Sequence, residues 1–149
     1  VLSPPTYLTT PPGQRSGDST IVAKPPVAPA PGPTPFTGAA LALPGTVQAE
    51  DFDHGGEMVG YHDADGVNSG GAYRPGGVDI ETTPDGGYDV GWIGVGEWLG
   101  YSVTIAAAGQ YRLEARVAAP GSGAVFHVEV GTADVTGPIA VPATGGWQV

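Results

Sequence analysis

The feature that most constrains the fold is a strict alternation of apolar and polar residues in several short segments after Gly45. It is found in residues 97–105, 109–119 and 124–130. A period of two is typical of strands with one buried face, because successive side chains of a strand point to opposite sides. We therefore expect half-buried antiparallel strands and no long helix in this part of the chain.

Turn-forming residues separate these segments. The chain holds 26 Gly and 16 Pro, and PGSG, AAAGQ and TPDGG stand between the alternating stretches. Several short strands at this spacing indicate an all-β fold, an antiparallel β-sandwich or jelly roll. The side chains expected to face inward are Leu99, Tyr101, Val103, Ile105, Tyr111, Leu113, Ala115, Val117, Phe126, Val128 and Val130.

Composition excludes several classes of function. The formal net charge is -10 and only five residues are Lys or Arg, so the chain lacks the basic surface that nucleic acids require. There is no cysteine, hence no disulfide framework and no thiolate chemistry. No apolar run approaches the roughly 18 to 20 residues that span a bilayer, so we expect no membrane partner. The first ten residues lack the features of a signal peptide, and any such peptide would lie upstream.

The sequence divides into two parts of different character. Residues 1–42 carry most of the prolines and few charges, which predicts a Pro-rich linker. Residues 1–22 are alternatively the end of an upstream domain, since YLTT and STIVA have some β character. Residues 43–149 form the predicted module. Because the chain ends at TGGWQV just as a strand would begin, we expect the module to be incomplete at its C-terminus.

The motifs VQAEDFD, GGAYR, VDIE, VGWIGVGEWLGYSV, GQYRLEARVA and TGGWQ occur in this order between residues 45 and 149. Over residues 43–149 the chain closely resembles family 6 carbohydrate-binding modules, in particular those attached to bacterial agarases, β-1,3-glucanases and related secreted hydrolases. The resemblance implies a jelly roll with a structural calcium ion and a sugar site in the loops at one end. It also implies a missing C-terminal stretch that would add closing strands, a polar sugar ligand and an acidic calcium ligand.

A calcium site is expected at Gln48 and Glu50. The two residues are two apart on a predicted strand, so an amide and a carboxylate would share one face, and both suit a hard cation. The resemblance implies calcium here and adds the backbone carbonyl of Arg74 as a ligand. The alternative is an exposed polar face. The remaining acids lack the spacing of an EF-hand loop, and we expect most of them on the solvated surface; they are Asp51, Asp53, Asp63, Asp65, Asp79 and Glu81.

The expected sugar-binding residues are aromatic. Trp92 and Trp147 lie beside glycines rather than inside apolar strands, and the resemblance implies that this pair holds a sugar ring from two loops. Glu57 matches a family position that accepts hydroxyl hydrogen bonds, and Tyr61 is a second possible aromatic wall. For all four, the alternative is packing within the fold. Trp98 adjoins a predicted strand core, so its expected role is structural.

Catalysis is not expected from this chain. Its three histidines are not spaced as a metal site or triad, and no GxSxG elbow occurs. Glu57 and Glu97 could be nominated as the two acids of a glycosidase, but nothing in the sequence places them opposite each other.

The predicted function is non-catalytic binding of a polysaccharide such as agarose, β-1,3-glucan or xylan. Such a module would keep a covalently linked glycoside hydrolase near its polymer in a secreted bacterial protein. Two alternatives remain open: a fragment of an enzyme whose catalytic domain is missing, and a calcium-stabilised structural or adhesion module.

Overall fold

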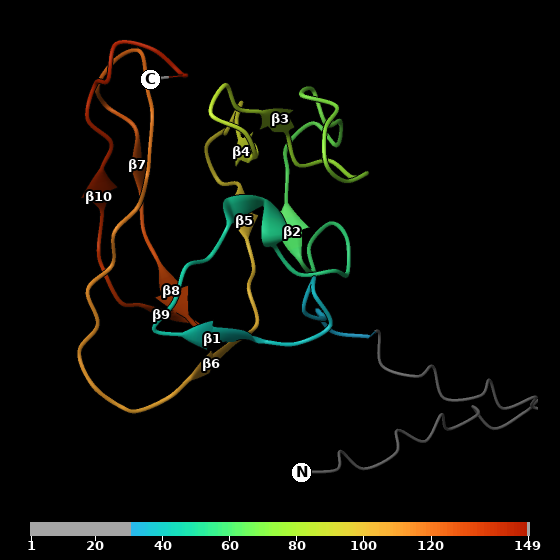
Figure 1. The fold of residues 1–149 in the computed structure, drawn as a ribbon, viewed down its shortest axis with the longest axis vertical. Helices are drawn as coiled ribbons and strands as arrows, with labels where there is room; N and C mark the ends of the chain where they lie inside the picture. Colours follow the sequence, from blue (N-terminus) through green and yellow to red (C-terminus); the bar gives the residue numbers. More distant parts are fainter. Residues whose placement is uncertain (1–30, 149) are drawn as a thin grey trace, which may run out of the picture. The chain divides into compact units, whose positions relative to one another are not determined.

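The computed structural model describes residues 31–148 (Figure 1), so the larger part of the expected linker, residues 1–30, lies outside the described residues. Short strands follow one another along the described residues, and the one helical element among them is a 3-10 turn of three residues. The prediction of an all-β fold with antiparallel sheets is therefore confirmed. In chain order the elements are β1 (Leu41–Leu43), η1 (Ala49–Asp51), β2 (Tyr61–His62), β3 (Ile80–Thr82), β4 (Tyr88–Val90), β5 (Trp98–Leu99), β6 (Val103–Ile105), β7 (Val125–Phe126), β8 (Glu129–Val130), β9 (Ala133–Asp134) and β10 (Ile139–Ala140).

The strands associate in pairs. β1 runs parallel to β6, with Leu41 opposite Val103. The other four pairs are antiparallel: β2 with β5, β3 with β4, β7 with β10, and β8 with β9. The pairs β2–β5 and β3–β4 both lie near the turn η1. These two pairs carry residues that surround the core.

The core is small and gathers residues from three motifs. Phe52, directly after η1, is buried against Val78 and Ile80 of the VDIE motif. Burial of each such side chain contributes about 1.5 to 3 kcal/mol. Around them pack the half-buried residues Tyr61, Val90, Leu99 and Tyr101. Strands β2, β3, β4 and β5 are thereby fixed around one apolar centre.

The packed structure reaches N-terminally beyond residue 43. Thr34 and His54 exchange two backbone hydrogen bonds of 3.1 and 2.8 Å. The Phe36 ring lies 4.4 Å from the guanidinium carbon of Arg74, and the Phe52 ring lies 3.8 Å from the same carbon. Arg74 is thus held between two aromatic rings, an arrangement that favours a cation. The boundary at 43 stays a prediction, but among residues 31–148 Thr34 and Phe36 already contact the rest of the fold.

The predicted inward-facing sets divide into two groups. Leu99 and Tyr101 pack on the core, whereas Val103 and Ile105 are exposed. Tyr111 and Leu113 are also exposed, and residues 111–118 are not paired as a strand, so their predicted burial was wrong. Alternation fixes which side chains share a face, but a face is buried only where another element covers it.

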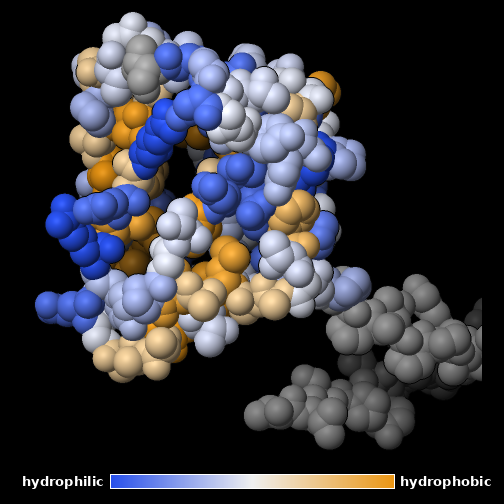
Figure 2. All heavy atoms as spheres, in the orientation of Figure 1, coloured by the Kyte–Doolittle hydropathy of each residue, from blue (hydrophilic) through white to orange (hydrophobic). Residues whose placement is uncertain are grey.

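An apolar hollow marks the uncovered part of the fold. It encloses about 230 Å³ and is lined by Leu113, Ala115, Val117, Phe126, Ile139, Ala140 and Pro142. Figure 2 shows apolar side chains gathered on the side of the molecule that carries β7 and β10. These side chains face each other across irregular chain rather than across a second sheet.

Three acids expected on the surface are buried instead. Asp53 accepts a hydrogen bond of 2.6 Å from the Ser102 hydroxyl. Asp63 accepts from the backbone amides of Asp65 and Gly66, each at 3.1 Å, and Asp79 is buried as well. The prediction failed at these positions because short carboxylates satisfy the free amides of loops that would otherwise be buried without partners.

Candidate functional site

Trp92 lies on an exposed loop in an uncommon backbone conformation. The loop, residues 91–97, connects β4 to β5, and 58% of the Trp92 surface is exposed. The φ angle of Trp92 is 48°, in the left-handed region that bulky residues rarely adopt. Such conformations cost about 1 to 3 kcal/mol and cluster at functional sites. Both its exposure and its strain argue against a role in core packing.

Trp147 is also exposed, and its segment is attached to β3 and β4. The exposed fraction of Trp147 is 63%. The neighbouring side-chain amide of Gln148 donates hydrogen bonds of 2.9 Å to Glu81 on β3 and to Asp89 on β4. Because β4 leads directly into the loop of Trp92, these bonds tie both tryptophan-bearing segments to one strand.

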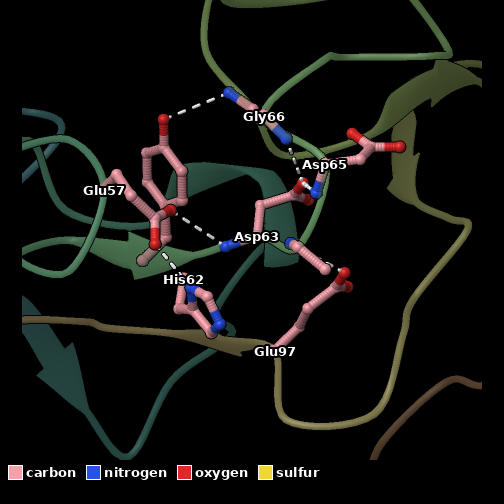
Figure 3. Close-up of polar contacts among 9 residues, drawn as sticks. Glu57, His62, Asp63, Asp65, Gly66 and Glu97 are labelled. Atoms are coloured by element: carbon pink, nitrogen blue, oxygen red, sulfur yellow. Dashed lines mark hydrogen bonds and ion pairs between the residues drawn. The ribbon is translucent and has the colours of Figure 1, made fainter.

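Glu97 fixes the loop of Trp92 to the strand that carries Tyr61. Its carboxylate accepts a hydrogen bond of 2.8 Å from the amide of Gly94 and one of 3.1 Å from the amide of Ala64. The preceding amide in the chain, that of Asp63, donates a hydrogen bond of 3.0 Å to the carboxylate of Glu57. Figure 3 shows Glu57 and Glu97 on either side of Asp63. The two carboxylates therefore bind consecutive amides of one segment.

These bonds give the two glutamates a positional role. Glu57 also shares a hydrogen bond with the ring of His62, and this bond, followed by the bond from the Asp63 amide, lowers the pKa of Glu57. A general acid needs a raised pKa, so Glu57 is unsuited to protonating a glycosidic oxygen. The hydrogen bonds of both glutamates fix neighbouring positions of one segment.

Tyr61 contacts the core as well as the loops. Its ring meets Phe52 edge-on, with 5.2 Å between centroids and an interplanar angle of 72°. Its hydroxyl accepts a hydrogen bond of 3.1 Å from the amide of Gly77. In the part of the chain that the structure describes, no hydrogen bond joins Glu57 or Tyr61 to Trp92 or Trp147. The assignment of all four residues to sugar binding remains a prediction.

A surface hollow of about 360 Å³ lies elsewhere. It is lined by Asn68 and by residues 71–76, which connect β2 to β3, and includes none of the four predicted sugar residues. Its wall contains Tyr73, whose ring packs 4.4 Å from that of Tyr88 and whose hydroxyl donates to Asp51. The hydrogen bond to Asp51 raises the pKa of Tyr73 to about 12, so this hydroxyl stays protonated at neutral pH.

The expected calcium ligands are arranged differently from the prediction. Residues 49–51 form the 3-10 turn η1 and not a strand, so Gln48 and Glu50 do not share a strand face. Gln48 is exposed at the start of the turn, while Glu50 is buried. The Arg74 carbonyl accepts a hydrogen bond of 3.1 Å from the Asn68 amide group. The strand prediction was wrong because η1 turns the chain toward Phe52.

Two buried carboxylate oxygens nevertheless suit a hard cation. Burial raises the pKa of Glu50, and nearby Asp51 and Asp89 raise it further. No Lys or Arg among residues 31–148 forms an ion pair with Glu50. Asp89 Oδ1 is buried and has no hydrogen-bond partner in the same residues. Carboxylate oxygens such as those of Glu50 and Asp89 are ligands of the kind calcium prefers, and in the described part no group of three or more His, Cys, Asp or Glu could hold a metal.

The two remaining histidines, His54 and His127, also make hydrogen bonds. His54 contacts the Phe36 carbonyl and His127 contacts Glu129, so each ring contacts another residue of the fold.

Within residues 31–148 no helix has both the length and the hydropathy to cross a bilayer.

Sequence reasoning missed three residues that position the tryptophans. Gln148, Asp89 and Glu97 each connect segments more than thirty residues apart. Glu97 begins the alternating segment 97–105 and was weighed only as a catalytic acid, and Asp89 belongs to none of the motifs to which a role was assigned. The available signal was the GxGE spacing around Glu97, in which glycines leave amides free for a following carboxylate.

Comparison with known proteins agrees with this architecture. The Clotting factor G alpha subunit of Tachypleus tridentatus is 35% identical to this chain over 75 residues. The match covers 48% of this chain but 11% of that protein, so the chain spans a small fraction of this relative. The family model described as Carbohydrate binding module (family 6) matches residues 71–149, more than half of the chain. An all-β fold with exposed tryptophans on braced loops, matched by this family model, makes the chain a member of carbohydrate-binding module family 6.

Proposed function

We propose that Trp92 and Trp147 form the aromatic platform on which this module binds a polysaccharide, without catalysing any reaction. The observation that carries the proposal is the exposed, left-handed Trp92 on a loop braced by Glu97. An indole face offers contact to the apolar face of a sugar ring, and a braced loop loses little entropy on binding. The bonds of Gln148 to β3 and β4 support the participation of Trp147.

The experiment is a glycan array and affinity electrophoresis with agarose, β-1,3-glucan and xylan. Replacing Trp92 or Trp147 with Ala should weaken binding by about 1 to 3 kcal/mol, the range for an aromatic anchor. The matched control is Tyr111→Ala, because Tyr111 is another exposed aromatic residue on a different segment. If the tryptophan variants bind as well as the control, the platform lies elsewhere.

Calcium is proposed as a structural ion. Glu50 and Asp89 would supply buried carboxylate oxygens, with Gln48 and the Arg74 carbonyl as the further ligands expected from the resemblance. The buried, unpartnered Asp89 Oδ1 and the raised pKa of Glu50 support this, since both oxygens lack a compensating cation. A bound ion would neutralise them and stabilise the folded state.

For the whole protein we propose secretion from a bacterium and a covalently linked glycoside hydrolase that the module holds near its polymer. A second candidate is a recognition subunit without hydrolase activity. The relative that favours the second candidate is named a clotting factor subunit. Assaying the full-length protein for hydrolysis of the polysaccharide that the module binds separates the two, since only the first requires activity.

A further inference from the structure

The loop that carries Trp92 presents two further apolar side chains to solvent. Ile93 is 68% exposed and Val95 is fully exposed, at 106% of its reference surface. Single apolar residues on a surface are common and need no explanation. Trp92, Ile93 and Val95, three exposed apolar residues within four positions of one loop, make an apolar tip. Such a tip is typical of an interaction site.

The backbone of this loop is braced at both ends, so the tip is held in place. Gly91 donates a hydrogen bond of 3.0 Å to the Asp79 carbonyl, and Gly94 donates to Glu97. A Cβ atom at Gly94 would lie 2.9 Å from Glu97 Oε1, so the Glu97 carboxylate approaches the backbone closely here. Ile93 lies directly between the two braced glycines and Val95 directly before Gly96. The exposure of these side chains is therefore a property of the folded loop.

The charge of the chain restricts what the tip can contact. The formal net charge is -10, and the acids Glu57, Asp63 and Glu97 lie around the base of the loop. An anionic membrane or an acidic polysaccharide would be repelled by this charge. An uncharged surface with an apolar face meets no such repulsion.

We propose that Ile93 and Val95 contact the packed chains of an insoluble, uncharged polysaccharide next to the ring held by Trp92. This inference rests on the proposed function of Trp92. One indole covers about one sugar ring, and the aliphatic side chains extend the apolar contact beyond it. A soluble oligosaccharide is a single chain and offers nothing beside the bound ring, whereas a packed polymer presents the rings of neighbouring chains there. Ile93 and Val95 thus select the polymer surface over the isolated chain.

The test compares two forms of the same sugar with the double variant I93S/V95S in the full chain. The probes are agarose beads, β-1,3-glucan particles and insoluble xylan, each paired with its own soluble hexasaccharide. We expect the variant to bind the particles about 5- to 10-fold more weakly, because about 40 to 55 Å² of apolar contact is lost, and the hexasaccharide within about 2-fold of the original. The control V130S alters another exposed valine, 57% exposed on β8, and should change neither.

Several results would overturn the inference. Equal losses on particles and hexasaccharide would put both side chains in the ring-binding site itself, and no loss on either would show that they make no contact. Binding to phosphatidylcholine vesicles that the variant loses, or a dimer that the variant abolishes in sedimentation, would assign the tip to a membrane or to a second copy. If the unaltered chain binds neither form of any sugar, the proposed function fails as well. If W92A loses binding to the hexasaccharide while I93S/V95S binds the particles as well as the unaltered chain, the inference fails and the proposed function stands alone.

Discussion

The backbone at Trp92 allows a prediction in which stability and binding change in opposite senses. Because the φ angle of Trp92 is 48°, a residue with a Cβ atom is strained there by about 1 to 2 kcal/mol, and glycine is not. Glycine loses about 0.5 to 1 kcal/mol more backbone entropy on folding than alanine. Trp92→Gly should therefore be more stable than Trp92→Ala by about 0.5 to 1 kcal/mol, the reverse of the order in an ordinary strand.

The indole itself contributes a limited amount to folding. With 58% of Trp92 exposed, about 100 Å² of a side chain of roughly 250 Å² is buried, which at about 25 cal/mol per Å² is worth at most about 2.5 kcal/mol. Trp92→Ala should lose about that much stability, and Trp92→Gly less. Both variants should lose sugar binding equally, by roughly 5- to 150-fold, which corresponds to about 1 to 3 kcal/mol.

The measurements are urea unfolding followed by tyrosine and tryptophan fluorescence and, for the folded protein, affinity electrophoresis with the bound polysaccharide. Two outcomes refute the reasoning. An alanine variant more stable than the glycine variant means that residue 92 has an ordinary backbone in solution. A glycine variant that still binds means that the indole is not the platform.

Three further predictions concern the second tryptophan, the proposed ion and one titrating pair. Trp147→Ala should cost at most about 2 kcal/mol of stability but weaken sugar binding by about 1 to 3 kcal/mol, and a loss of 3 to 5 kcal/mol in denaturant unfolding would indicate a core residue instead. Calcium should raise the melting temperature and excess chelator should lower it, and in calorimetry Asp89→Asn should reduce the rise that calcium causes. An unchanged melting temperature after confirmed metal removal counts against Glu50 and Asp89 as ligands. The pKa of Glu57 should lie below its usual value in an NMR titration and rise in His62→Ala. The stability that this bond contributes is then complete above the unfolded-state pKa and is lost as pH falls through the lower folded-state pKa. An equal pKa of Glu57 in both proteins would show that His62 is not its partner.

The sequence predicts the fold class well because alternation and turns are local signals. The residues at 97–101 carry the pattern, and Leu99 and Tyr101 pack on the core as expected. The same pattern at Tyr111 and Leu113 failed, because their burial depends on an element from elsewhere in the chain that would cover them. A periodic pattern contains no information about that second element.

The candidate site was predictable in its aromatic residues and not in its supports. Glycine-flanked tryptophans indicate exposed loops, and Trp92 and Trp147 are exposed. The bond from Gln148 to Asp89 spans 59 residues, and the one from Ala64 to Glu97 spans 33. Such contacts follow from how the strands pair, so residue type and spacing cannot reveal them. The role of Glu50 as a calcium ligand stays a prediction, and the strand expected there is a 3-10 turn.

The Arg74 sandwich has a mechanical consequence. Within residues 31–148, the contacts nearest the N-terminal end are the bonds between Thr34 and His54, followed by Phe36 on Arg74. Arg74 in turn lies on Phe52 and donates a hydrogen bond of 2.6 Å to its carbonyl. When the module is fixed to an immobile polymer and the preceding chain is pulled, the load passes through this series of contacts directly into the core. The first event under load is then the release of Thr34 and Phe36, and a short length of chain is yielded before the residues that hold the polymer feel the force.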